Sequence, residues 1–94
     1  MAVYSTILDV SAIAAYIPTT PSVVIPFTPT SITVVNLDTA DVVAVSLDGT
    51  NDAARLFPGT PCQGMTWKQR VQSVWLHVVG VPVGTTNVQI MAED

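Results

Sequence analysis

Charged side chains are scarce in this sequence. Asp, Glu, Lys and Arg make up 11% of the 94 residues, whereas about 25% is usual, and the mean hydropathy is +0.50. The only basic residues are Arg55, Lys68 and Arg70, and with seven acidic residues the net charge is -4. Such a chain cannot build the basic face that binds a phosphate backbone. We therefore expect no nucleic-acid partner, and we expect some of the apolar surface to face another protein chain.

Cysteine and histidine each occur once, as Cys62 and His77. A single cysteine excludes an intrachain disulfide and a cysteine-based zinc site, and it favours synthesis in a reducing compartment. We interpret Cys62 as a structural residue of a Pro/Gly-rich loop at 58–64. A nucleophilic role would need a base beside it, and His77 lies in a strand-like run. One histidine is a poor metal site, so no metal and no cofactor are expected.

The N-terminal residues lack the features of a signal peptide or a spanning helix. The opening M-A-V-Y-S-T has no basic region, and Asp9 and Ser11 interrupt the apolar stretch from Ile7 to Ile17. Neither pattern fits insertion into a bilayer. We expect no membrane partner.

The clearest structural pattern is a β-hairpin from Val42 to Phe57. Val43, Val45 and Leu47 alternate with smaller residues, which is the two-residue period of a strand with one buried face. Asp48-Gly49 opens a polar turn, and an apolar run then resumes. The acidic turn could also suggest a calcium site, but no bidentate glutamate follows it, so a turn is the better interpretation.

Four further segments have the pattern of strands, namely Ser31–Asn36, Met65–Gln69, Val71–Val79 and Thr86–Met91. Short strands at regular spacing with turn residues between them predict an all-β fold, an antiparallel β-sandwich or jelly roll of about six to eight strands. We place this β-sandwich domain at residues 31–94. The segment 74–79 is apolar on both faces, so we expect it to be central and covered on both sides, by the N-terminal residues or by another subunit.

Residues 1–30 are predicted to form an extended N-terminal arm rich in proline and threonine. Prolines at 18, 21, 26 and 29 disfavour helix and confine any strand to a sheet edge. Within the arm we expect a short helix at 12–17 and an edge strand at 23–25. An apolar arm with few internal partners could bind a neighbouring subunit.

Aromatic and apolar residues are the candidates for such an interface. Trp75 falls on the face opposite Val74 and Leu76, where an aromatic side chain can mark an interface centre or stack on a sugar ring. Acidic residues lie mostly in turns, where carboxylates are solvated, so we expect no enzymatic activity. The predicted interface residues are Val23, Val24, Ile25, Phe27, Trp67, Trp75 and His77.

Several motifs in residues 31–91 suggest a family. The order S-I-T-V-V-N, V-V-A-V-S-L-D-G-T-N-D-A-A-R-L-F-P-G-T-P, V-W-L-H-V-V and T-T-N-V-Q-I-M-A resembles small β-sandwich structural proteins of tailed bacteriophages. The resemblance leaves out the first thirty residues and transfers no catalytic residues.

This resemblance implies a virion structural protein made in the host cytoplasm. Its expected role is that of a capsid decoration or cement protein, or a minor head protein, that forms a homo-oligomer, with a trimer favoured, and binds the major capsid protein or another virion protein. The alternative is a carbohydrate-binding or receptor-binding module of a phage tail or spike.

Overall fold

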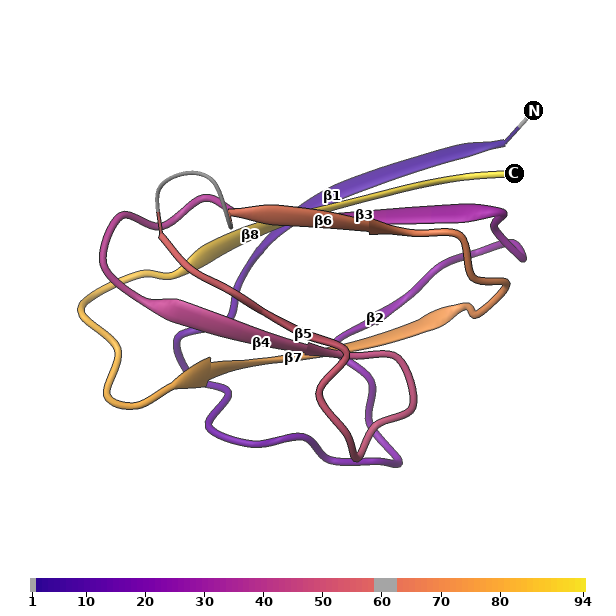
Figure 1. The fold of residues 1–94 in the computed structure, drawn as a ribbon. Coiled ribbons are helices and arrows are strands. Elements are labelled where there is room, and N and C mark those ends of the chain that lie inside the picture. The colour runs from indigo at the N-terminus through magenta and orange to yellow at the C-terminus, as the bar shows by residue number, and fades with distance from the viewer. Residues whose placement is uncertain (1, 59–62) are drawn as a thin grey trace.

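The computed structural model describes residues 2–58 and 63–94, and it is all-β. The predicted position of Cys62 in a loop lies outside the described residues. Within them, eight strands form two antiparallel sheets that pack face to face (Figure 1). The strands are β1 (Val3–Asp9), β2 (Val23–Val24), β3 (Ser31–Asn36), β4 (Val42–Ser46), β5 (Ala54–Leu56), β6 (Gly64–Trp67), β7 (Ser73–Val79) and β8 (Asn87–Glu93).

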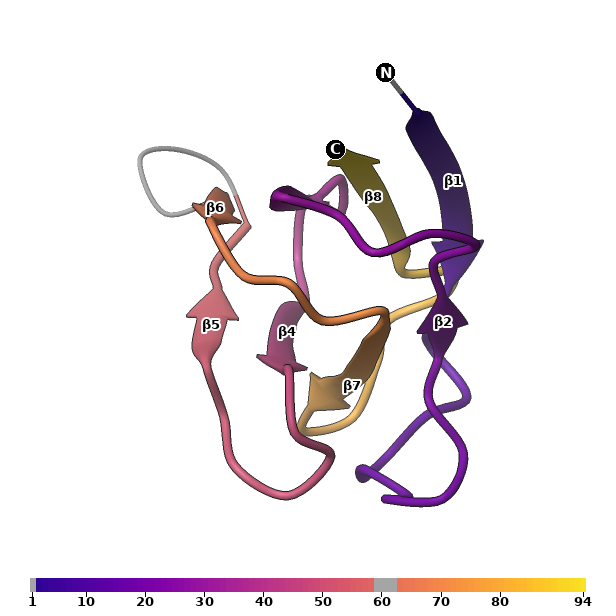
Figure 2. The same cartoon turned by 90° about the vertical axis from the view of Figure 1, so that its right-hand side faces the viewer.

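The strand order is that of a jelly roll. The first sheet has the order β1-β8-β3-β6 and the second sheet has the order β2-β7-β4-β5. Every connection crosses between the sheets except the β4–β5 hairpin, and Figure 2 shows the two sheets from their ends. Eight strands in two sheets of this kind define the jelly-roll architecture. The predicted antiparallel sandwich or jelly roll of six to eight strands is therefore confirmed.

The core lies between the sheets, and strand alternation supplies its side chains. In β7, Val74, Leu76 and Val78 are buried, while the residues between them are only partly covered. Fully burying one such side chain contributes about 1.5 to 3 kcal/mol. The apolar core residues are Val10, Val23, Ile25, Ile32, Val34, Val43, Val45, Leu56, Val74, Leu76, Val78, Val88, Ile90 and Ala92.

The predicted hairpin forms, with Val43 opposite Leu56 and Val45 opposite Ala54. One detail of the prediction is wrong. We expected Ala44 and Ser46 to be the exposed side of the strand, yet both are fully buried. The connecting segment of residues 11–22, called the strap below, passes beneath β4 and β7 and covers the outer face of the second sheet (Figure 1).

The first thirty residues are extended, but they do not form a separate arm. β1 pairs with β8 along its whole length, and β2 pairs with the edge of β7. The predicted edge strand near Val23 is thus present, and β7 is central between β2 and β4 as expected. Because this segment also supplies three core residues, deleting it would unfold the protein rather than free it from a partner.

The predicted helix at 12–17 is wrong, since no helix occurs in residues 2–58 or 63–94. Two carbonyls of this segment bond to β7 and do not form helical turns. The carbonyl of Ile13 accepts a hydrogen bond from Val78 N at 3.0 Å, and the carbonyl of Ile17 accepts one from the Trp75 side chain at 2.9 Å. Tertiary hydrogen bonds therefore override a weak local helix preference.

Candidate interaction surfaces

The outer face of the second sheet is occupied by the strap. Trp75 and His77 point from β7 toward it, and the Tyr16 ring meets the His77 ring edge to face with centroids 4.5 Å apart. The Trp75 indole donates to the carbonyl of Ile17 and packs against the backbone at Gly49. These aromatic side chains therefore hold parts of their own chain together.

A polar network joins the strap to the hairpin turn. The Tyr16 hydroxyl donates to Asp52 at 2.6 Å, and Arg55 Nε donates to the other oxygen of the same carboxylate at 3.1 Å. Hydrogen bonds from Tyr16 and then Arg55 lower the pKa of Asp52. Burial, and then the bond to Asp52, raise the pKa of Tyr16 well above 10.0. Near neutral pH the pair is a fixed donor and acceptor and does not exchange protons.

The carboxylate of Asp48 organises the tip of the hairpin. Its Oδ1 accepts hydrogen bonds from the backbone N–H groups of Thr50 and Asn51, at 2.9 and 2.8 Å, and from the Ser46 hydroxyl at 2.9 Å. The N–H groups, that of Asn51 first, lower the pKa of Asp48 from 3.8. The arrangement is an Asx turn, as expected from the sequence.

Acid should weaken this turn. The pKa of Asp48 in the folded protein lies below 3.8, its value in the unfolded chain. As the pH falls, the unfolded chain therefore binds a proton before the folded protein does. The stability that the Asp48 carboxylate contributes above pH 3.8 is lost as the pH falls through its folded pKa. We expect Asp48→Asn to be less stable than the wild type at pH 7 but to lose less stability between about pH 5 and pH 2. Urea unfolding at a series of pH values measures both slopes. Equal acid slopes would contradict the role of this carboxylate.

Two of the predicted interface residues are in the core of their own chain. Val23 and Ile25 were expected to contact a neighbouring subunit, but they are 7% and 0% exposed. The reason is that β2 and the residue after it close the edge of β7, so their inward side chains fill the space between the sheets. Their neighbour Val24 points outward and is 60% exposed.

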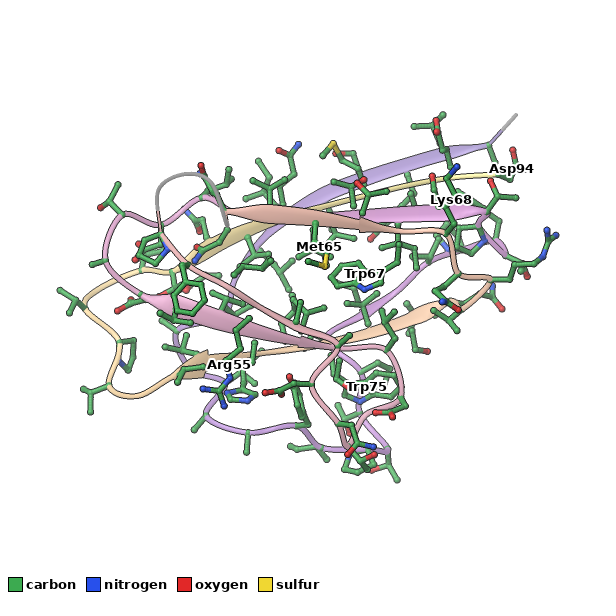
Figure 3. All side chains as sticks on the ribbon, viewed as in Figure 1. Arg55, Met65, Trp67, Lys68, Trp75 and Asp94 are labelled. Atoms are coloured by element: carbon green, nitrogen blue, oxygen red, sulfur yellow. The ribbon has the colours of Figure 1, made fainter. Side chains whose placement is uncertain are left out.

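The other predicted residues divide between the core and the strap. Phe27 and Trp67 are partly buried and pack against the core, and Figure 3 shows Trp67 and Met65 pointing from β6 toward the second sheet. Trp75 lies on the far side of that sheet (Figure 3), with His77 two residues along the same strand. The predicted residues therefore do not gather on one surface.

Sequence analysis missed a different surface, the outer face of the first sheet. The strand register places Ser5, Met91, Thr33 and Thr66 in one row across the four strands. A second row contains Ile7, Gln89, Val35 and Gly64. Neither row contains a charged residue. Charge appears toward the ends of the sheet, at Glu93, Asp9 and Lys68, the last of which follows β6.

This face has a shallow depression of about 310 Å³. Val3, Ser5, Thr33 and Met91 line it, together with the charged Glu93 near the end of β8. Small hydroxyl, amide and aliphatic side chains of this kind can be covered by another protein at little desolvation cost. No single strand of the sequence identifies this face, because the two rows of residues appear only when β1, β8, β3 and β6 are aligned in register.

A polar cluster connects the two sheets at one end. Asn36 is fully buried, and its amide donates to the carbonyls of Asp41 and Leu56 at 2.8 and 3.0 Å. The Asp41 carboxylate accepts hydrogen bonds from Thr86 Oγ1 at 2.8 Å and from Val83 N. These groups satisfy one another, so the cluster is structural.

The described residues contain no group of three histidine, cysteine or acidic side chains placed to hold a metal. Across residues 2–58 and 63–94, every buried side-chain nitrogen and oxygen has a hydrogen-bond partner. In the same ranges no helix has the length and apolarity to cross a membrane. No protein-family model matches the chain, and no curated protein matches it significantly.

Proposed function

We propose that this protein is a non-enzymatic virion structural protein, a decoration, cement or minor head protein of a tailed bacteriophage that binds and stabilises a larger shell. It is made in the host cytoplasm and assembles as a homo-oligomer. Its partner is the major capsid protein or another virion protein.

The observation that carries this proposal is the uncharged central part of the outer face of the first sheet. Its two central rows, from Ser5 to Thr66 and from Ile7 to Gly64, span all four strands without a charge. An uncharged patch on an acidic chain suits burial against a larger protein surface. The acidic groups support a non-enzymatic role, because the carboxylates of Asp48, Asp52 and Asp41 accept hydrogen bonds within turns and between segments of the fold.

The jelly roll is compatible with the proposal but does not select it. Viral capsid proteins, lectins and cupins share this architecture. Fold alone therefore does not assign an activity. The sequence resemblance to phage structural proteins and the uncharged face supply the preference.

The test places one charge in the middle of the face. Val35 lies on β3 in the second row, and Val35→Lys would put an ammonium group where the shell must bind, at a cost of several kcal/mol if it is left unpaired. Particles of the encoding virus are assembled with wild-type or variant protein, and copies per particle are counted by quantitative mass spectrometry. We expect occupancy to fall at least about tenfold, which corresponds to about 1.4 kcal/mol.

Val81→Lys is the matched control, because Val81 is an exposed valine in the β7–β8 loop, 90% accessible and outside this face. Its occupancy should equal that of the wild type. Absence of the protein from purified particles, or equal occupancy of both variants, would contradict the proposal. Saturable binding of a glycan that is lost in Trp75→Ala would favour the carbohydrate-binding alternative instead.

A further inference from the structure

The four edges of the two sheets differ in how they are protected. Natural proteins protect edge strands by shortness, proline or charge, since an unprotected edge pairs with another strand. β2 has two residues and lies between Pro21 and Pro26, while β5 has three and carries Arg55. β6 has four residues and is followed by Lys68. β1 has seven, with no proline and no charge before its last residue, Asp9.

The backbone of β1 has free hydrogen-bonding groups on its outer side. At one end the Ala2 carbonyl accepts from Asp94 N at 3.1 Å, and at the other Val10 N donates to the Thr86 carbonyl at 2.9 Å. Between these points the β1–β8 register is unbroken. Because hydrogen-bonded and non-hydrogen-bonded pairs alternate along an antiparallel ladder, the even-numbered residues bond to β8. The odd-numbered residues Val3, Ser5 and Ile7 therefore direct their N–H and C=O groups away from the sheet.

The side chains of these residues are also uncovered. Val3 is 69% exposed and Ile7 is 58% exposed, and both lie on the outer face of the first sheet. One strand thus presents apolar side chains and backbone donors and acceptors together. An extended strand with a matching arrangement of groups could pair with this edge, and β1 of another copy has that arrangement.

We propose that β1 pairs with β1 of a second copy of this chain, antiparallel, across a twofold axis at Ser5. This register sets Val3 of one copy opposite Ile7 of the other, and Ser5 opposite Ser5. All three facing pairs are residues with outward backbone groups, so they form about six hydrogen bonds, two for each pair. The two first sheets then become one continuous eight-stranded sheet with a shared outer face.

The register follows from the geometry of the edge. A shift of one residue would set the outward groups of one strand against groups that already bond to β8. An axis at Thr6 keeps the hydrogen bonding but places Val3 opposite the charged Asp9. With the axis at Ser5, the two Asp9 carboxylates lie about 26 Å apart, at about 3.3 Å per residue, which is beyond the reach of their repulsion in physiological salt.

The oligomeric state of the purified full chain tests this proposal without any virus particle, so its outcome is independent of the proposed function. We expect a dimer by sedimentation velocity and native mass spectrometry, in place of the trimer that the sequence analysis favoured. Ser5→Pro removes an outward N–H and fixes φ at about −65°, which an edge strand can tolerate, and Ile7→Lys places a charge in the facing pair. Each should raise the dimer Kd at least about a hundredfold. Val81→Lys makes the same type of change at an exposed residue outside β1, and it should remain dimeric.

Cysteine pairs test the register in a Cys62→Ser background. Hydrogen-bonded antiparallel pairs have Cα atoms about 5.5 Å apart, a distance that a disulfide can span. Ser5→Cys alone should form a covalent dimer on oxidation. Val3→Cys and Ile7→Cys should crosslink when mixed but not singly. The proposal would be overturned by a wild-type protein that is monomeric at about 100 µM or that forms a trimer. It would also be overturned if both β1 variants remain folded and still dimerise as the wild type does.

Discussion

Gly49→Ala is expected to destabilise the protein by about 2 to 5 kcal/mol. Gly49 has φ of +86°, and an added Cβ would lie 3.0 Å from Cε2 of Trp75 and 3.2 Å from Cα of Pro18. A side chain in this left-handed conformation costs about 1 to 2 kcal/mol, and forcing a methyl group into a packed site costs about 1 to 3 kcal/mol more. Urea unfolding, followed by tryptophan fluorescence, measures the loss.

Gly80→Ala separates the two contributions. Gly80 also has φ of +86°, but nothing lies within 4 Å of its added Cβ. It should therefore show only the backbone cost of about 1 to 2 kcal/mol. The difference between the variants then reports the cost of forcing a methyl group between the hairpin turn, Trp75 and the strap. Equal losses in the two variants would show that the hairpin turn is not packed tightly against Trp75 and the strap.

Asn36→Leu is expected to cost about 3 to 5 kcal/mol, although the two side chains have the same number and branching of heavy atoms. The amide of Asn36 satisfies two buried carbonyls, and its Oδ1 accepts from Asp38 N at 2.9 Å. Leucine would leave all three groups without that partner, and each unsatisfied buried group costs about 1 to 3 kcal/mol. Because Asn36 belongs to β3 and Leu56 to β5, losing this hydrogen bond should weaken the contact between the two sheets. Chemical unfolding and hydrogen exchange at Asp38 N measure it.

Asn36→Asp makes the same site sensitive to pH. The carboxylate keeps the acceptor for Asp38 N, but it faces the carbonyls of Asp41 and Leu56, and so its pKa is raised by burial and repulsion. The deficit relative to the wild type should shrink as the pH falls, because the protonated group can donate to one carbonyl. Gln69→Glu, at an exposed position of the β6–β7 loop, is the control and should change stability by less than about 0.5 kcal/mol. A deficit that does not change with pH would contradict this account.

The core strands could be predicted because each has one buried face and one more exposed face, which gives an alternating sequence pattern. In β3 and β8 apolar residues alternate with polar ones, so Ile32, Val34, Val88 and Ile90 could be assigned inward from the sequence alone. β1 also alternates in burial, but Val3 and Ile7 make its outer side apolar, and this hid the two-residue period. Its partner β8 lies at the other end of the chain, so no local signal identified the pairing.

The surfaces were harder to predict than the strands. The prediction that the segment 74–79 needs a cover on both sides was correct, but apolarity does not say whether that cover is the same chain or another. The strap provides it, and this reassigned Trp75 and His77 from a free surface to an internal contact. The outer face of the first sheet has only moderately apolar residues in each strand, and it becomes recognisable only when the strands are aligned.

The pairing of β1 with β8 also has a consequence for synthesis of the chain. β8 lies beside β1 in the finished sheet, yet its first residue, Asn87, is made long after Asp9 leaves the ribosome. Translation adds about 5 to 20 residues per second, so β1 waits for several seconds with both edges unpaired. During that time both edges of β1 are open to pairing with the wrong strand, so the nascent chain is exposed to misfolding and aggregation until β8 is made.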